Sequence, residues 1–364
     1  MRIMFAGGGT GGHIYPAIAV AEEINHKQPE TEFLFVGGTR GREQKIVGNS
    51  GFPVTTIPVT ALPRKISPRL LSFTVKLGIS IIKSHRYIKK FKPAVVMATG
   101  SYVSGPPMIA ALTMGVPLVI HEQNSYPGIT NRKLGRFADI VFLGFENAEK
   151  YFEGNIKAVV TGNPVTKNIG AGLRNEAARV FGFDPSLKTV FVFGGSQGAR
   201  AINKALSMAV EDIAERGIQV LWQTGDREYE LWAPYDKRSE GRIRTFRYID
   251  NMAQAYAAAD LVVARAGAMS IAEITVCGLP AVFVPLPTAA GNHQEYNART
   301  VVEKGAASVI FERELTSTLL EQEIVRIVTS DERLAAMAKS SENLGRKDAA
   351  SAIAGIIIDR YGHN

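Results

Sequence analysis

Short runs of apolar residues alternate with longer amphipathic stretches along the whole chain, which predicts strands and helices in turn. Continuous apolar runs of this length are typical of strands that are buried on both faces of a parallel sheet. The pattern therefore predicts an α/β protein. The expected strands are 3–6, 32–36, 54–57, 94–97, 117–120, 140–143 and 158–160 in the first half, and 189–193, 219–223, 243–246, 261–264, 281–284 and 307–310 in the second.

One arrangement of strand, glycine-rich loop and helix occurs twice. The first loop is at 7–12 with a helix expected from Tyr15, and the second is at 194–198 with a helix expected from Ala199. Such a loop directs backbone N–H groups and the positive end of a helix dipole at an anion. Two copies predict two nucleotide-type domains that face one cleft and hold a phosphate-bearing molecule from both sides.

The length of 364 residues suits two α/β domains. Turn-forming residues at 161–164 are expected to separate them, which gives domains at 1–163 and 164–342. Residues 314–361 predict consecutive helices without strands, and a helix at about 343–364 is expected to pack back on the first domain.

The composition favours a protein of a reducing compartment. Cys277 is the single cysteine, so no intrachain disulfide can form. No apolar run reaches the roughly 18 residues of a membrane span. Glycines and His13 interrupt the apolar stretch at the start of the chain, so no signal peptide is expected there.

Positive charge is concentrated in one segment. The formal net charge is +8, from 42 basic and 34 acidic residues, yet no acid occurs between Glu43 and Glu122. Within this segment a helical pattern at 64–91 combines apolar residues with cations, which suits an anionic membrane surface. A core helix with a solvated basic face is the alternative, and nucleic acid is disfavoured because no aromatic reading surface accompanies the charge. The residues assigned to the membrane are Leu70, Phe73, Lys76, Leu77 and Lys83.

The first glycine loop satisfies the G-x-G-x-x-G pattern of dinucleotide sites. The second strand of such a site ends in an acid that holds the ribose, whereas this chain continues with glycines at 37–38. NAD(P) is therefore disfavoured, and a tight turn that needs glycine for steric reasons remains an alternative. His13 follows the loop and is a candidate proton acceptor.

Polar residues follow two further strands of the first half. One group is at 99–105 and includes Tyr102, and the other consists of His121, Glu122 and Asn124. The second group lacks the second histidine of an H-E-x-x-H zinc signature. Because strand ends of one sheet lie together, these groups are expected to line one site, although ordinary loop polarity would give the same pattern.

In the second half, small residues at 266–268 follow a strand and allow close approach of backbone to a phosphate. Glu273 lies about two turns into the next helix, where it can accept hydrogen bonds from ribose hydroxyls or act only as a favourable charge near the helix start. The loop at 288–294 carries His293 and Gln294, which could contact sugar hydroxyls.

In this order the blocks resemble those of the bacterial peptidoglycan N-acetylglucosaminyltransferases that convert lipid I to lipid II. Any one block is shared by many two-domain glycosyltransferases, whereas the ordered set is specific and covers essentially the whole chain. The resemblance rests on residues 8–16, 99–106, 121–124, 162–164, 194–199, 265–273 and 293–298.

The resemblance implies the GT-B fold, in which two Rossmann-like domains face a central cleft. It implies inverting transfer of GlcNAc from UDP-GlcNAc to the muramoyl-pentapeptide of undecaprenyl-diphosphate lipid I, without metal or other cofactor, by a peripheral protein at the cytoplasmic face of the bacterial membrane. The chain contains no Asp-x-Asp, which agrees with a reaction that needs no metal.

Motif matching extends the resemblance to individual residues. It implies that Ile249 contacts uracil through its backbone, that Glu273 binds the ribose hydroxyls and that His13 is the base. The implied donor contacts are Thr10, Gly11, Gly12, Asn124, Thr166, Ser196, Ile249, Ala268, Met269, Ser270, Ile271, Ala272, Glu273 and Gln294. The implied acceptor contacts are His13, Tyr102, His121 and Glu122, of which His13, His121 and Glu122 are the expected catalytic residues.

One position departs from the family pattern. The family often has Gly-Asn-Pro-Val-Arg at the domain junction, with the arginine on the diphosphate, and this chain has Thr166 followed by Lys167. Either Lys167 supplies the charge or the contact is lost. The alternatives to the transferase are another sugar-nucleotide enzyme of the same fold (a UDP-GlcNAc 2-epimerase or a glycolipid glycosyltransferase) and a sugar-nucleotide-binding module without catalysis.

Overall fold

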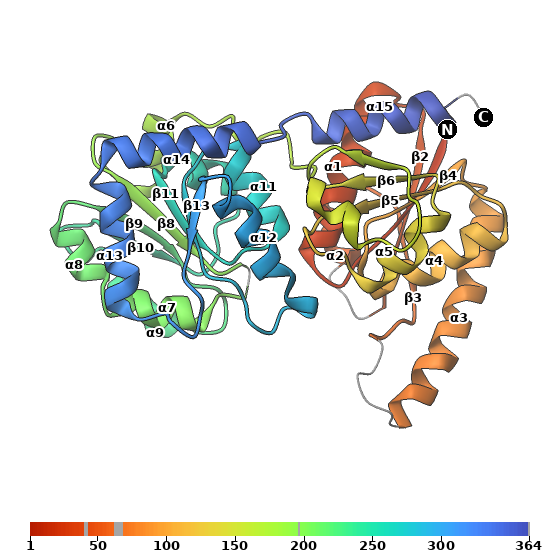
Figure 1. Cartoon of the computed structure of the whole chain (residues 1–364), viewed down its shortest axis with the longest axis horizontal. Helices are drawn as coiled ribbons and strands as arrows, with labels where there is room; N and C mark the ends of the chain where they lie inside the picture. The colour runs from red at the N-terminus through yellow and green to blue at the C-terminus, as the bar shows by residue number, and fades with distance from the viewer. Residues whose placement is uncertain (40–42, 62–67, 196, 363–364) are drawn as a thin grey trace. The chain divides into compact units, whose positions relative to one another are not determined.

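A computed structural model of the chain describes residues 1–39, 43–61, 68–195 and 197–362. The chain forms two compact units. Unit 1 comprises Met1–Thr166 together with Arg346–Asn364, and unit 2 comprises Lys167–Gly345. Each unit is a parallel β-sheet covered by helices (Figure 1).

Unit 1 is built on a seven-stranded parallel sheet with the order β3-β2-β1-β4-β5-β6-β7. Its strands are β1 (Arg2–Ala6), β2 (Glu32–Gly38), β3 (Val54–Ile57), β4 (Val95–Ala98), β5 (Leu118–Glu122), β6 (Ile140–Leu143) and β7 (Ala158–Val160). Its helices are α1 (Gly11–Lys27), α2 (Glu43–Asn49), α3 (Pro68–Phe91), α4 (Ser101–Thr113), α5 (Ile129–Leu134) and α15 (Ala349–Tyr361), with short 3₁₀ turns η1 (Gly135–Phe137) and η2 (Glu146–Tyr151).

Alternate side chains of β1 enter different cores, as the period of two in a strand requires. Ile3 and Phe5 pack with α1, α2 and α15 on one face of the sheet. Met4 and Ala6 pack with α3 and α4 on the other face. The glycine loop that follows β1 therefore starts from a strand that is fixed on both faces.

Unit 2 is built on a six-stranded parallel sheet with the order β10-β9-β8-β11-β12-β13. Its strands are β8 (Thr189–Phe193), β9 (Gln219–Gln223), β10 (Ile243–Phe246), β11 (Leu261–Ala264), β12 (Ala281–Phe283) and β13 (Ala307–Val309). Its helices are α6 (Arg174–Phe181), α7 (Arg200–Ser207), α8 (Val210–Glu215), α9 (Tyr229–Trp232), α10 (Met252–Ala258), α11 (Ala268–Val276), α12 (His293–Val302), α13 (Ser317–Val328) and α14 (Asp331–Leu344), with 3₁₀ turns η3 (Ala233–Tyr235) and η4 (Ala290–Asn292).

The strand order reverses next to β1 in unit 1 and next to β8 in unit 2. In unit 1 the chain passes from β1 outward to β2 and β3 and then returns to β4 on the other side, and unit 2 repeats this with β8, β9, β10 and β11. Ligands of open α/β sheets bind at the carboxyl ends of the strands where this reversal occurs. A ligand site is therefore expected at the loops after β1 and β4 in unit 1, and at the loops after β8 and β11 in unit 2.

All thirteen expected strands form, with ends that differ by two residues or fewer. The predicted run of helices after residue 314 is also confirmed. The start of α1 was predicted too late, because the helix begins at Gly11 and the last glycines of the loop belong to its first turn. Within the described residues, no helix is both long and apolar enough to cross a membrane.

Candidate active site

A buried glutamate lies directly beneath the first glycine loop. Oε1 of Glu43 accepts the N–H of Gly9 at 2.6 Å and lies 3.4 Å from the N–H of Gly38. A Cβ on Gly8 would lie 2.1 Å from that same oxygen, so a side chain there would displace the carboxylate from this position. Glu43 thereby fixes the turn that presents Thr10 and the first residues of α1.

His13 lies in the first turn of α1 and is held through one ring nitrogen. Its Nδ1 is 2.9 Å from the carbonyl oxygen of Thr99 and 3.0 Å from Oε1 of Gln123. The hydroxyl of Thr99 donates in return to the carbonyl of His13 at 2.6 Å. Because both partners of Nδ1 are acceptors, Nδ1 carries the proton, and Nε2 is the basic nitrogen of the neutral ring.

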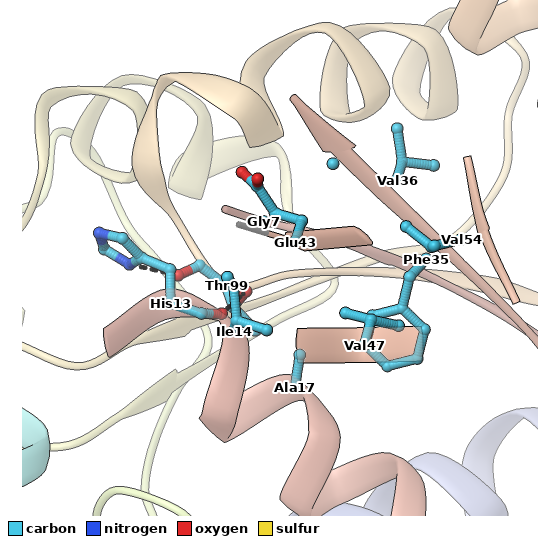
Figure 2. A pocket seen from close by; sticks show the side chains of 11 residues that line it. Gly7, His13, Ile14, Ala17, Phe35, Val36, Glu43, Val47, Val54 and Thr99 are labelled. Carbon is cyan, nitrogen blue, oxygen red and sulfur yellow. Dashed lines mark hydrogen bonds between the residues drawn. The ribbon is translucent and has the colours of Figure 1, made fainter. Parts of the chain in front are cut away.

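A small cavity lies beside His13 (Figure 2). It has a volume of about 10 Å³, which is at most the space of one water molecule. Figure 2 shows the imidazole of His13 and the side chain of Thr99 on one side, with Phe35 and Val47 on another. The carboxylate of Glu43 also lines it. This cavity is too small for a sugar. It lies among the residues that pack beneath the glycine loop.

The structure buries His121 completely. Burial lowers the pKa of its imidazole to about 4, so the ring is neutral at ordinary pH. Its Nε2 is 3.2 Å from the carbonyl oxygen of Gly162, and its Nδ1 is 2.9 Å from Nε2 of Gln123. The ring is thus enclosed by protein, and the acceptor contact expected for His121 from the sequence stays a prediction.

Glu122 is also buried, and both of its oxygens are occupied. Oε1 accepts the backbone and side-chain N–H groups of Asn124, at 2.9 and 3.1 Å. Oε2 accepts the N–H of Gly128 at 3.0 Å and Nδ2 of Asn131 at 2.9 Å. This carboxylate closes the loop after β5 and positions Asn124, and the catalytic role expected for Glu122 from the sequence stays a prediction.

Two of the expected residues lie at the surface of unit 1. Tyr102 is 43% exposed in the first turn of α4, and its ring lies close to Gly9 of the glycine loop. Thr10 is exposed at the N-cap of α1. Together with His13 they surround the carboxyl ends of β1 and β4.

In unit 2 the second glycine loop packs directly on the chain after β9. Gly198 has a φ of +75°, and a Cβ on it would lie 2.1 Å from the carbonyl oxygen of Thr224. Gly225 faces it with a φ of +86°. This backbone-to-backbone contact leaves no room for a side chain and fixes the path of the loop. Ser196, which is expected to contact the diphosphate, lies outside the described residues.

The start of α11 offers backbone donors. Gly267 is the N-cap and makes no side-chain cap, and the first bond within the helix runs from the N–H of Ile271 to the carbonyl of Gly267 at 2.9 Å. The amides of Ala268, Met269 and Ser270 precede that bond, which is the arrangement that binds phosphate. The side chain of Ile271 is buried in the core, and Ala272 is half-buried on the next turn.

Glu273 lies on the second turn of α11 and is the most perturbed acid of this region. Burial raises the pKa of its carboxyl to about 7. Its Oε2 accepts the hydroxyl of Tyr256 at 2.8 Å. Burial and the negative charge of Glu273 raise the pKa of Tyr256 well above its usual value, so the tyrosine is a permanent donor.

Other expected donor contacts are already held by the protein. The N–H of Ile249 donates to Oε1 of Gln223 at 2.8 Å, so the carbonyl of Ile249 is the backbone group that remains for a nucleobase. Oε1 of Gln294 accepts the N–H of Leu286 at 2.9 Å, so its amide nitrogen is the group that remains for a sugar. Nδ1 of His293 lies 2.8 Å from the carbonyl oxygen of Ala290. Thr166 is the last residue of the first stretch of unit 1, at the position that departs from the expected arginine.

The exposed apolar row of α3 differs from the one selected from the sequence. Leu70, Phe73 and Leu77 are only partly exposed, as are Lys76 and Lys83. Leu71 is 71% exposed, and Val75, Ile79 and Ile82 are also exposed. These four residues, called here the α3 apolar row, follow one another at helical spacing. Figure 1 shows the amino-terminal part of α3 projecting beyond the rest of unit 1. Residues 62–67 of the basic segment lie outside the described residues.

Sequence reasoning missed three residues that hold the site. Glu43, Gln123 and Tyr256 each contact a candidate residue that is far away in the sequence. Gln123 follows two selected residues, His121 and Glu122, and precedes a third, Asn124, so its position was a usable signal. Glu43 and Tyr256 gave none, because an acid at a helix start and an aromatic residue on an apolar helix face are ordinary features.

Comparisons with known proteins agree over nearly the whole chain. The sequence profile of the glycosyltransferase family 28 N-terminal domain matches residues 3–143, and that of the family 28 C-terminal domain matches residues 189–353. A UDP-N-acetylglucosamine–N-acetylmuramyl-(pentapeptide) pyrophosphoryl-undecaprenol N-acetylglucosamine transferase of Moorella thermoacetica is 41% identical, over 98% of each chain. The protein of the same name from Desulforudis audaxviator is 40% identical, again over 98% of each chain.

Solved structures give the same result for the fold. The crystal structure of Acinetobacter baumannii MurG superposes with a TM-score of 0.77 at 28% identity, covering 98% of this chain and 99% of that one. A putative UDP-N-acetylglucosamine 2-epimerase of Listeria monocytogenes has a TM-score of 0.71 at 16% identity, which shows a shared fold only. The two Rossmann-like units are those of a GT-B glycosyltransferase, and the chain belongs to glycosyltransferase family 28.

Proposed function

We propose that this protein transfers GlcNAc from UDP-GlcNAc to the muramoyl-pentapeptide of undecaprenyl-diphosphate lipid I, with inversion, and so makes lipid II for peptidoglycan. The near-full-length identity to the transferases named above supports this substrate pair. The observation that carries the chemistry is the orientation of His13, whose Nδ1 faces two acceptors and whose Nε2 is therefore basic.

The reaction needs a base and a place for the leaving charge. The hydroxyl oxygen of the acceptor sugar bonds to the anomeric carbon of UDP-α-GlcNAc while Nε2 of His13 takes the hydroxyl proton. The bond between that carbon and the diphosphate oxygen breaks, and its electron pair leaves with UDP. The amides at the start of α11 would stabilise the charge on the departing diphosphate.

Unit 2 is the proposed donor unit. Glu273 would accept the ribose hydroxyls, the carbonyl of Ile249 would bind uracil, and Gln294 with His293 would contact the hydroxyls of GlcNAc. Ser196 would approach the diphosphate. Lys167 is the proposed replacement for the arginine that the family often has one position earlier, at Thr166.

Unit 1 is the proposed acceptor unit. Tyr102 would contact the acceptor, and Thr10, Gly11, Gly12 and Asn124 would meet the transferred sugar. His121 and Glu122 would act by positioning Gln123 and Asn124, because both are buried. The protein is proposed to be peripheral at the cytoplasmic face of the cell membrane, where the α3 apolar row and neighbouring lysines would meet an anionic surface.

The test is to incubate the purified protein with radiolabelled UDP-GlcNAc and a short-chain lipid I analogue in the presence of EDTA. Labelled disaccharide lipid is expected. Epimerised UDP-GlcNAc without lipid product would instead support the 2-epimerase. UDP-GlcNAc binding without either product would favour a different acceptor or a binding module.

A pair of variants tests the base. His13→Ala should lower turnover by about 100-fold or more, the scale of general-base catalysis, while UDP-GlcNAc affinity changes little. His26→Ala is the matched control, since His26 is exposed in the last turn of the same helix. Normal turnover of His13→Ala would remove His13 from this role.

A further inference from the structure

We propose that Gln123, backed by His121, is a positioning residue that holds His13 with its proton on Nδ1 and so keeps Nε2 as the base. The role of His13 as the base rests on the proposed function. The hydrogen bonds that hold the ring are present in the protein without ligand. It concerns two residues whose side chains are buried.

The direction of every hydrogen bond in this group can be assigned. Nε2 of Gln123 lies 3.1 Å from the carbonyl oxygen of His121, which only accepts. This contact fixes the orientation of the amide and turns Oε1 of Gln123 toward Nδ1 of His13, 3.0 Å away. A glutamine held in this way presents an acceptor to His13 and cannot present a donor.

His121 completes the chain of bonds. The amide nitrogen of Gln123 also donates to Nδ1 of His121 at 2.9 Å. Nδ1 of His121 must therefore lack a proton, and Nε2 of that neutral ring carries it and donates to the carbonyl of Gly162 at 3.2 Å. The series of donors runs from His13 to Gln123, and from Gln123 through His121 to Gly162.

The surroundings keep the series rigid. Gln123 is buried, and Nδ2 of Asn163 donates to its backbone carbonyl at 3.0 Å. A Cβ on Gly100 would lie 3.2 Å from Nδ1 of His13, so the backbone there packs closely on the imidazole. With the carbonyl of Thr99 as second acceptor, rotation of the imidazole by 180° would place a C–H where two acceptors now receive an N–H.

The first test is Gln123→Met, which keeps the length of the side chain and removes its amide. It should lower kcat by about 10-fold or more and leave the KM for UDP-GlcNAc nearly unchanged. Because the effect acts through His13, Gln123→Met should cost little further activity in a His13→Ala background. If Gln123→Met lowers kcat by the same factor in the His13→Ala background as in the wild type, the proposal is overturned.

The second test does not depend on activity. In protein labelled with ¹⁵N-histidine, the ring shifts of the free wild type should report the Nδ1–H form for His13 and the Nε2–H form for His121. In Gln123→Glu, at a pH where the new carboxylate is ionised and offers only acceptors, His13 should keep its proton on Nδ1 and His121 should gain a proton on Nδ1. An unchanged His121, or a wild-type His13 with its proton on Nε2, would overturn the relay.

The two proposals fail separately. Absence of lipid product from the wild type would contradict the proposed acceptor and leave the histidine shifts as predicted. If Gln123→Met does not fold, Gln123→Glu still decides the question through the state of His121.

Discussion

The hydroxyl of Tyr256 donates a 2.8 Å hydrogen bond to Oε2 of Glu273. The ring of Tyr256 is buried and lies edge-on to Phe191 and Phe193, with centroid distances of 5.8 and 6.1 Å. A rigid, permanently protonated donor therefore holds one oxygen of the carboxylate that is proposed to bind ribose. Oε1, the other oxygen of Glu273, is the one that we propose to accept the ribose hydroxyls.

The substitution Tyr256→Phe removes this hydrogen bond and keeps the ring packing. We expect the affinity for UDP to fall about 5- to 10-fold, which corresponds to roughly 1 kcal/mol for the lost orientation. Isothermal titration with UDP measures this change. Tyr361→Phe is the control, because the hydroxyl of Tyr361 is buried in unit 1 and has no hydrogen-bond partner among the residues that the structure describes. Equal affinities in wild type and Tyr256→Phe would contradict the positioning role.

Glu273 should make donor binding and stability depend on pH in opposite directions. Its folded-state pKa is raised to about 7, so the carboxylate that accepts ribose hydroxyls forms only as pH rises through 7. UDP affinity should therefore increase several-fold from pH 6 to pH 8, and the increase should disappear in Glu273→Gln.

The same raised pKa has the reverse effect on folding. The neutral carboxyl stabilises the fold below its unfolded pKa, and this stability is lost as pH rises through about 7. Glu273→Gln should therefore have a free energy of unfolding up to about 3 kcal/mol higher than that of the wild type at pH 8, and a similar one at pH 4.5, as denaturant unfolding at the two pH values would measure. If the wild type is more stable than Glu273→Gln at pH 8, the carboxylate of Glu273 does not carry the cost of a buried charge.

The glycine loop of unit 2 offers a matched pair of substitutions. Gly198→Ala places a Cβ 2.1 Å from a backbone oxygen, whereas the Cβ of Gly195→Ala, at a φ of +87°, meets no atom of the other described residues within 4 Å. Gly195→Ala should cost about 1–2 kcal/mol from left-handed backbone strain alone. Gly198→Ala should cost clearly more and weaken UDP binding as well. Similar unfolding temperatures for the two variants would show that the contact at Thr224 is readily relieved.

The α3 apolar row gives a test of membrane binding. Replacing Leu71, Val75 and Ile79 with serine should lower binding to anionic vesicles by more than about 10-fold, because each removes apolar surface that the bilayer would bury. The control replaces Leu173 and Val180 with serine, since both are large exposed apolar residues of unit 2. Sedimentation with vesicles measures both variants. Equal loss in the control, or retained binding of the α3 variant, would contradict this surface.

The positions of the site loops could be predicted from the sequence, and their internal contacts could not. Apolar runs mark the strands, and parallel strands bring their following loops to one edge, so His13 and Glu273 could be selected. The bond between His13 and Gln123 joins residues 110 positions apart, and its geometry depends on how β1 and β5 are spaced in the sheet. No local pattern encodes such a distance.

The burial of charged and polar residues was the second feature that could not be predicted from the sequence. His121 and Glu122 were selected because polar groups follow a strand, yet both are the last residues of β5 itself and point into the interior. On α3 the apolar residues cover more than one face, so periodicity alone could not separate the packed row from the exposed one.

The placement of α15 has a consequence for biosynthesis. Ile353, Ala354, Ile357 and Tyr361 fill the same core as Ile3 and Phe5, although 179 residues of the other unit intervene in the chain at Lys167–Gly345. On the ribosome, the first 166 residues therefore emerge with one face of their sheet covered by α1 and α2 but not by α15, and the apolar surface that α15 covers stays exposed until the second unit has been made. Chaperone binding during translation should thus be concentrated on the amino-terminal unit, and release should follow the emergence of residues 349–361.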